Sequence, residues 1–225
     1  MDIPRDPAAD PLMLAAGFLN HHPDLRFRLQ GQKAYVTGAR AKARDLFERA
    51  AMYGDKPSQG LIAEMLWSGD GIPKDRALAY AWMDLAAERA YRPLLVLRER
   101  YWEAMDAQER TVAIQRGVAL YERYGDAVAK PRLASILRRG RMHTTGSRTG
   151  FTGNLTVIVP WGGGEMSIPG SQFYDARYWQ PDQYWAWQDA VWKNPRTGVV
   201  KVGSVENASE APLPKKASDE AGKDD

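Results

Sequence analysis

The chain carries few of the side chains on which enzymes and metal sites depend. It has no cysteine and only three histidines, which excludes disulfides, thiolate metal sites and a cysteine nucleophile. His21 and His22 are adjacent and would point apart on a helix, whereas two metal ligands on one helical face stand three or four residues apart. With His143 as the third histidine, we predict neither a metal nor a cofactor.

Phosphate-binding and hydrolase motifs are also missing from the sequence. The glycines at 162–164 are not followed by Lys-Ser or Lys-Thr, and no G-x-S-x-G elbow occurs. Four carboxylates do lie among aromatic residues, as glycoside hydrolysis would require: Glu165, Asp175, Asp182 and Asp189. The alternative is that these acids are surface residues and the rings pack internally. We favour this alternative and predict a protein that is not an enzyme.

Aromatic residues concentrate in the last third of the chain. Five of the eight tryptophans lie between Trp161 and Trp192, and residues 173–192 contain eight aromatic side chains. Exposed rings can anchor a protein interface or stack on sugar rings. We therefore expect partner-binding residues in this Trp/Tyr cluster: Tyr178, Trp179, Tyr184, Trp185 and Trp187. The alternative is that these rings pack against helices.

Basic residues concentrate just before this segment, at Arg132, Arg138, Arg139, Arg141 and Arg148. The whole chain has 31 basic and 28 acidic residues, a net charge of +3, which is too balanced to indicate nucleic-acid binding. We favour a solvated helix for this basic cluster over a nucleic-acid or anionic surface. Arg138 and Arg139 join the predicted partner-binding residues.

The elements that must position these residues are helical from residue 11 to residue 141. Apolar and alanine positions recur three and four residues apart in this region. We expect a first helix from Pro11 to about Asn20 and a second from Pro23 to about Thr37, with Gly38 as its left-handed cap.

Two stretches of this helical region are alike at an offset of 36 residues. Ala43 corresponds to Ala79, Phe47 to Met83, and the alanine pair at 50–51 to the pair at 86–87. A weaker third copy covers residues 119–126. We expect each copy to be followed by a helix that begins with a proline, at Pro57, Pro93 and Pro131. Such helical pairs are too small to bury their own apolar faces and must stack.

The repeat resembles the Sel1-like repeat, a relative of the tetratricopeptide repeat. The family's loop signature G-x-G-h-x-x-D is complete from Gly69 to Asp75, and residues 39–92 carry the resemblance, whereas the glycine loop is absent over 93–141. The resemblance implies a mainly α fold, a short right-handed solenoid of helical pairs over residues 11–141. It also implies a non-enzymatic adaptor that binds a protein or peptide, often in a bacterial envelope complex.

Residues 142–206 form an irregular, aromatic-rich and Gly-rich extension. Leu155–Val159 is a short β-like run that ends at Pro160, and Val199–Val205 is a second run. The two runs either pair with each other as a hairpin or stay unpaired. Residues 184–192 fit one or two helical turns. The extension has too few aliphatic residues for its own core, so we expect it to pack on the array, capping its last helices or lying in its groove.

The two ends of the chain carry little pattern. Residues 1–10 are predicted to be flexible and residues 207–225 disordered. The start lacks the basic and apolar regions of a signal peptide, so the protein is cytoplasmic or a leader has been removed. We favour a periplasmic or envelope location and expect no transmembrane segment. The predicted function is a protein-binding scaffold. The alternative is an envelope glycan-binding module, which requires exposed rings at Trp179, Trp185 or Trp187.

Overall fold

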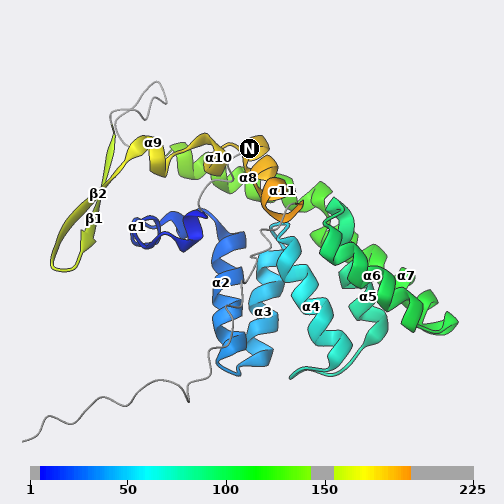
Figure 1. Ribbon diagram of the computed structural model, residues 1–225. Helices are drawn as coiled ribbons and strands as arrows, with labels where there is room; N and C mark the ends of the chain where they lie inside the picture. Colours follow the sequence, from blue (N-terminus) through cyan, green and yellow to red (C-terminus); the bar gives the residue numbers. More distant parts are fainter. Residues whose placement is uncertain (1–5, 143–154, 194–225) are drawn as a thin grey trace, which may run out of the picture. The chain divides into compact units, whose positions relative to one another are not determined.

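The protein is mainly α-helical, with one small β-hairpin (Figure 1). The computed structural model describes residues 6–142 and 155–193. The sequence-predicted strand at 199–205 and the tail at 207–225 lie outside this range. The helices of the first part are η1 (Pro7–Ala9), α1 (Pro11–Ala15), η2 (Phe18–Asn20), α2 (Pro23–Val36), α3 (Arg40–Ala51), α4 (Lys56–Ser68), α5 (Arg76–Ala86), η3 (Ala87–Arg89), α6 (Arg92–Ala104), α7 (Ala107–Tyr124) and α8 (Asp126–Met142). The second part contains β1 (Thr156–Trp161), β2 (Gly164–Pro169), α9 (Gly170–Phe173), α10 (Ala176–Trp179) and α11 (Pro181–Lys193).

Helices α2 to α7 form an array of neighbouring helical pairs, as the repeat predicts. The main contacts join α2 to α3, α4 to α5, and α5 to α7. Helix α5 begins at Arg76, 36 residues after Arg40 of α3, and α6 begins at Arg92, 36 residues after Lys56 of α4. The sequence period is therefore the period of a two-helix unit.

Local chemistry explains where these helices begin and end. The Asp75 carboxylate accepts a hydrogen bond from the Leu78 backbone N–H at 3.0 Å and caps α5, and Asp55 caps α4 in the same way. Gly54 and Gly69 both have a φ of +76°, the left-handed conformation that glycine adopts without strain. The paired alanines of both repeats are buried, so the helix backbones can pack closely: Ala50, Ala51, Ala86 and Ala87.

Helix α8 departs from the predicted repeat. It begins at Asp126, and Pro131 lies inside it, so the prediction that Pro131 begins a helix is wrong. The Arg89 guanidinium holds the Asp126 carboxylate with two hydrogen bonds of 2.7 Å and so fixes the start of the helix upstream of the proline. From there α8 runs past Gly54 towards His21, across the helix ends and not alongside α7 (Figure 1).

The N-terminal region is also more broken than predicted. The expected single helix over residues 11–20 is two short pieces, α1 and η2, because Gly17 between them has a φ of +81°. Residues 6–10, which we expected to be flexible, contain η1, in which Pro7 and Ala8 are buried. The Asp10 carboxylate accepts a hydrogen bond from the Leu12 backbone N–H at 2.9 Å and caps α1.

The β-hairpin is local. Strands β1 and β2 are antiparallel, with Trp161 opposite Gly164, and the two-residue turn between them has positive φ at both Gly162 and Gly163. The predicted end of the strand at Pro160 is therefore wrong. The two residues that flank a two-residue turn, here Trp161 and Gly164, form a hydrogen-bonded pair. Pro160 is one residue further from the turn, at a position that makes no hydrogen bond to the partner strand, so its missing N–H costs nothing within the hairpin.

The extension packs on the first helices as well as on α8. Its aromatic rings form one core with Phe18 and Leu25 near the N-terminus and with Leu133 and Leu137 of α8. A second core lies inside the array and includes Phe47, Trp82 and other members of the repeat. The extension therefore lies beside the first helices as well as α8, and the sequence did not indicate the contact with the first helices.

Candidate functional site

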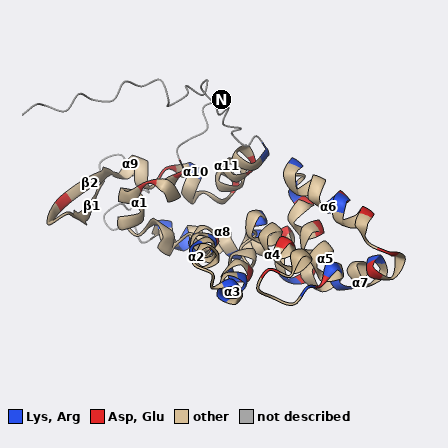
Figure 2. Ribbon diagram, turned by 60° about the horizontal axis from the view of Figure 1, so that its bottom comes forward, with Lys and Arg blue, Asp and Glu red and all other residues tan. Residues whose placement is uncertain are grey.

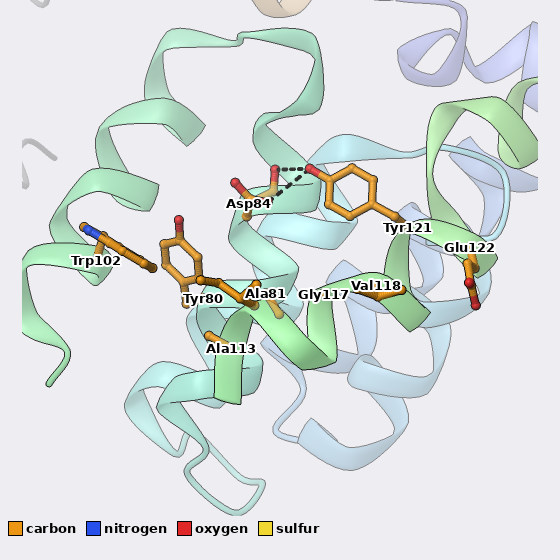
Figure 3. Close-up of a pocket in the computed structure, with 10 residues that line it drawn as sticks. Tyr80, Ala81, Asp84, Trp102, Ala113, Gly117, Val118, Tyr121 and Glu122 are labelled. Carbon is orange, nitrogen blue, oxygen red and sulfur yellow. Dashed lines mark hydrogen bonds between the residues drawn. The ribbon is translucent and has the colours of Figure 1, made fainter. Parts of the chain in front are cut away.

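A groove with a volume of about 540 Å³ opens between α5, α6 and α7 (Figure 3). Its size falls within the range of about 300–1,000 Å³ that is common for ligand pockets. It is lined by Tyr80, Ala81, Asp84, Trp102, Ala113, Ile114, Gly117, Val118, Tyr121 and Glu122. Most of these are apolar or aromatic, and the charged groups are two carboxylates.

An apolar strip on α7 forms one side of the groove. Ile114 and Val118 stand one helical turn apart and are 60% and 59% exposed. Between them, Gly117 has open space where a Cβ atom would point, with no described atom within 4 Å. Isolated exposed aliphatic residues are common on protein surfaces, but two on one face beside an unfilled glycine leave room for another side chain.

Two aromatic rings form the wall at one end of the groove (Figure 3). The rings of Tyr80 and Trp102 lie 5.0 Å apart between centroids at an angle of 45°. The Arg110 guanidinium lies 4.9 Å from the Trp102 ring centre, and its Nε donates a 3.0 Å hydrogen bond to the Trp102 carbonyl. The wall is therefore held in place before any partner binds.

The other end of the groove is acidic. The Tyr121 hydroxyl lies 3.2 Å from both the carbonyl oxygen and a carboxylate oxygen of Asp84 (Figure 3). Burial and the nearby Asp84 carboxylate raise the pKa of Tyr121, so the hydroxyl stays a donor. Arg98 lies 3.6 Å from Asp84, and Glu122 adds a second carboxylate to the lining. The Asp84 carboxylate therefore already has a hydroxyl donor and a cation beside it.

Most of the predicted Trp/Tyr cluster is in the interior of the protein. Trp179 is 1% exposed and Tyr184 is 0% exposed, and Tyr178 and Trp187 are buried as well. The Trp179 Nε1 donates a 2.6 Å hydrogen bond to the Phe173 carbonyl. The expectation of exposed rings at Trp179 and Trp187 is therefore wrong, because these rings supply the core that the extension would otherwise lack.

Trp185 joins the extension to the second repeat. It is half-buried, with the Arg89 guanidinium 4.5 Å and the Lys130 ammonium 5.6 Å from its ring centre. Close by, the Tyr91 hydroxyl donates a 2.7 Å hydrogen bond to the Asp189 carboxylate of α11. Trp185 thus has a structural role as a platform for two cations.

Arg138 and Arg139 lie on α8 and are exposed. The Arg139 Nε donates a 3.3 Å hydrogen bond to the Ser135 carbonyl one turn earlier. Neither residue lines the groove between α5, α6 and α7. Their predicted part in partner binding stays a prediction.

A buried polar cluster fixes α11 to the start of α2. The Tyr184 hydroxyl donates a short hydrogen bond to the Asp24 carboxylate, and burial raises the pKa of Asp24 to about 6. The two ring nitrogens of His22 lie 2.8 Å from the Phe18 carbonyl and 2.9 Å from the Tyr178 carbonyl. Burial lowers the pKa of His22 to about 4, against these two carbonyls, which favour the charged ring.

A second polar cluster, built around the buried Lys56 ammonium, joins α4, η3 and α8. The Lys56 ammonium is 2.6 Å from the Glu88 carboxylate and 3.2 Å from the Asp126 carboxylate. Burial lowers the pKa of Lys56, and Asp126 opposes this shift. Burial would raise the pKa of Asp126, but the hydrogen bonds from Arg89 and the charge of Lys56 outweigh it and lower that pKa. Saturated contacts of this kind indicate a structural role.

The four carboxylates considered for hydrolysis have separate surroundings. Asp175 caps α10 and pairs with Arg177, and Asp189 accepts from Tyr91. Asp182 lies in the first turn of α11, and Glu165 is exposed on the hairpin.

Within residues 6–142 and 155–193, no group of three or more His, Asp or Glu side chains is placed to hold a metal. In the same ranges, no helix is both long enough and apolar enough to span a bilayer.

Sequence reasoning found only part of the groove. The aromatic residues of the repeat helices are divided between core and groove: Trp82, Tyr91 and Tyr101 are buried, whereas Tyr80 and Trp102 line the groove. The residues that sequence reasoning missed are Asp84, Ile114, Val118, Tyr121 and Glu122. A usable signal was present, because α7 has two aliphatic residues four positions apart around a mid-helix glycine.

Comparisons with known proteins add little to this picture. No family model matches the chain, and no curated protein matches its sequence. Among solved structures, the chain is similar to a protective antigen present in uropathogenic Escherichia coli strains that displays an SLR (Sel1-like repeat) fold, with 20% identity and a TM-score of 0.42. The similarity covers 59% of this chain and only 27% of the antigen's chain. The helical-repeat architecture described above rests on the chain's own helices.

Proposed function

We propose that the protein is a non-enzymatic interaction scaffold that binds a segment of another protein in the groove between α5, α6 and α7. The observation that carries this proposal is the open apolar strip of Ile114 and Val118 around the unfilled position at Gly117. The strip lies between the Tyr80–Trp102 wall and the acidic end. The groove therefore offers apolar contact and two chemically different ends that can orient a bound segment.

The lining specifies the chemistry of the partner segment. An apolar side chain of the segment rests over Gly117, between the strip and the Tyr80–Trp102 wall. A lysine or arginine of the segment lies near Asp84 and Glu122. Full burial of one aliphatic side chain contributes about 1.5–3 kcal/mol, whereas an exposed ion pair contributes about 0.2–1 kcal/mol. The apolar anchor therefore supplies most of the affinity, and the basic residue sets the orientation.

The proposal includes an envelope location only as a prediction from the resemblance to Sel1-like repeats. Glycan binding by the Trp/Tyr cluster has weaker support, since Trp179 and Trp187 are buried.

Peptide selection tests the groove. A phage-displayed library of random 16-residue peptides is selected on the full chain, and the enriched peptides are measured against Gly117→Leu, which fills the open space. The matched control is Val36→Leu, which changes an 84% exposed residue on α2. We expect peptides with an apolar centre and a Lys or Arg flank, and at least a roughly tenfold affinity loss for Gly117→Leu only. No enrichment, or equal binding to Gly117→Leu, would refute the proposal.

A further inference from the structure

The groove is bordered by two helices that run along its length in the same direction. Tyr80 of α5 packs on the small core that contains Ala113 of α7, at the end of the groove with the aromatic wall. One turn further along α5, Asp84 lies beside the Tyr121 hydroxyl near the end of α7. Helices α5 and α7 are therefore parallel, and they lie side by side with α6 to one side of them (Figure 2). The groove follows the axes of both helices.

The exposed face of α7 has the shape that accepts a side chain from a neighbouring helix. Four residues of α7 that line the groove stand at positions i, i+3, i+4 and i+7: Ile114, Gly117, Val118 and Tyr121. Residues at this spacing surround the hole into which one side chain of a facing helix inserts. Gly117 contributes no side chain, and no described atom lies within 4 Å of the place where its Cβ would be. The face of α7 therefore offers a packing position to a helix that lies alongside it.

The polar groups of the lining distinguish a helical partner segment from an extended one. The middle of the groove is apolar, and no Asn, Gln, Lys or Arg side chain is among the lining residues that the structure describes. The Tyr121 hydroxyl is already within hydrogen-bond distance of Asp84. An extended segment would bury backbone N–H and C=O groups without partners here, which is unfavourable, whereas a helix pairs its own backbone groups. The lining therefore favours a helix.

One carboxylate beside this face has no ion-pair partner. Glu122 is exposed and lines the groove, and it forms no ion pair with a residue in the described part of the chain. It follows Val118 by one helical turn and Ile114 by two. Asp84, by contrast, already lies beside Tyr121 and 3.6 Å from Arg98. A cationic side chain on the partner would therefore be complementary to Glu122, at a fixed distance from the apolar strip.

We infer that the partner segment binds as an amphipathic α-helix that lies lengthwise in the groove, with two apolar side chains one turn apart and a lysine or arginine one turn beyond the second. This inference rests on the proposed function and adds the conformation and spacing of the partner segment. Ile114 and Glu122 are separated by about 12 Å along α7. A helical segment covers this distance with about eight residues, whereas an extended segment covers it with about four.

The peptides enriched on the full chain test the helix by their spacing and by the effect of a cross-link. We expect two apolar positions three or four residues apart, and a Lys or Arg about seven or eight residues from the first. The tightest peptide is then made with a lactam bridge between two outward-facing residues four positions apart, with the unbridged peptide as its matched control. Because residues four apart are neighbours only on a helix, the bridge should tighten binding about three- to tenfold. A proline at a central outward-facing position should weaken binding by about a hundredfold or more.

A charge reversal on the protein tests the spacing. Glu122→Lys should weaken binding of the tightest peptide by about three- to tenfold, and replacing the basic residue of the peptide by Glu should restore the affinity. The matched control is Glu103→Lys, which changes an exposed residue of α6 outside the groove lining and should leave the affinity unchanged. Restoration by a Glu placed about four residues from the first apolar position would indicate an extended segment and overturn the inference.

The outcomes separate the inference from the proposed function. Peptides that lose affinity on Gly117→Leu but bind more weakly with the lactam bridge, or tolerate the central proline, overturn the inference and leave the groove as the binding site. An absence of any enriched peptide overturns both. Concentration-dependent self-association of the full chain that Gly117→Leu abolishes would show that a second copy fills the groove, and it also overturns both.

Discussion

Replacing Asp24 by Asn should make the free energy of unfolding depend more strongly on pH than it does in the wild-type protein. Asp24 and His22 are both fully buried near the start of α2, and their pKa values shift to about 6 and about 4, respectively. The groups facing Asp24 are Tyr184 of α11, Arg28 of α2 and Asp55 before α4. Asn keeps the shape and an oxygen that accepts from the Tyr184 hydroxyl, so the variant should fold.

The two shifts have opposite effects on stability. The pKa of Asp24 is raised above its unfolded value near 3.8, so its protonation stabilises the fold as the pH falls through about 6. The pKa of His22 is lowered from 6.5, so the unfolded chain takes up the proton first and the fold loses stability as the pH falls from 6.5 towards 4. Between about pH 7 and pH 4.5 each effect amounts to roughly 2 kcal/mol, and they nearly cancel.

Urea unfolding followed by tryptophan fluorescence measures this difference at pH 7.0, 6.0, 5.0 and 4.5. The difference in unfolding free energy between wild type and Asp24→Asn should change by roughly 2 kcal/mol across this range, with the variant losing stability as the pH falls. Subtracting the two proteins removes the titration of Glu64, whose pKa burial raises. Parallel curves for the two proteins would refute the placement of Asp24 as a buried, titrating carboxylate.

Two pairs of substitutions test the other packing claims. Gly140→Ala places a Cβ 2.6 Å from the Trp179 ring and should lower the free energy of unfolding by about 1–3 kcal/mol in urea titrations. Gly117→Ala adds its Cβ in open space and should raise the free energy of unfolding by about 0.5–1 kcal/mol. An equal effect of the two substitutions would contradict the packing of α8 on α10. Lys56→Met removes a fully buried ammonium that the partly exposed carboxylates of Glu88 and Asp126 share, and it should lower the thermal midpoint by an amount equivalent to about 1.5–3 kcal/mol. Lys130→Met removes a more exposed partner and should cost less than about 1 kcal/mol, so similar losses would argue against a buried role for Lys56.

The repeat could be predicted from the sequence because its determinants are local. The capping carboxylate of Asp75 and the left-handed glycine at 69 each depend on residues within a few positions, and the same local pattern recurs 36 residues apart. Helix α8 could not be predicted in the same way. Its course depends on the contact of Asp126 with Arg89, 37 residues earlier in the chain, and the local proline at 131 indicated a different start.

The aromatic residues show a different limit of sequence reasoning. Composition located the cluster at 173–192, but it does not separate a ring that forms a core from a ring that binds a partner. Tyr184 is buried because its hydroxyl meets Asp24, 160 residues away in the chain. The hairpin was predicted in part: a first strand begins near the expected place but continues through Pro160, and the two glycines at 162 and 163 make a tight turn to a second strand at Gly164–Pro169.

Site-specific crosslinking tests the binding groove most directly. A photoreactive benzophenone side chain is placed at Val118, in the groove, and in a second protein at Val36, which is exposed on α2. Each protein is irradiated with the tightest selected peptide, and the crosslinked products are identified by mass spectrometry. Binding in the groove predicts a crosslink from position 118 and none from position 36. A crosslink from position 36, or equal yields at both, would contradict it.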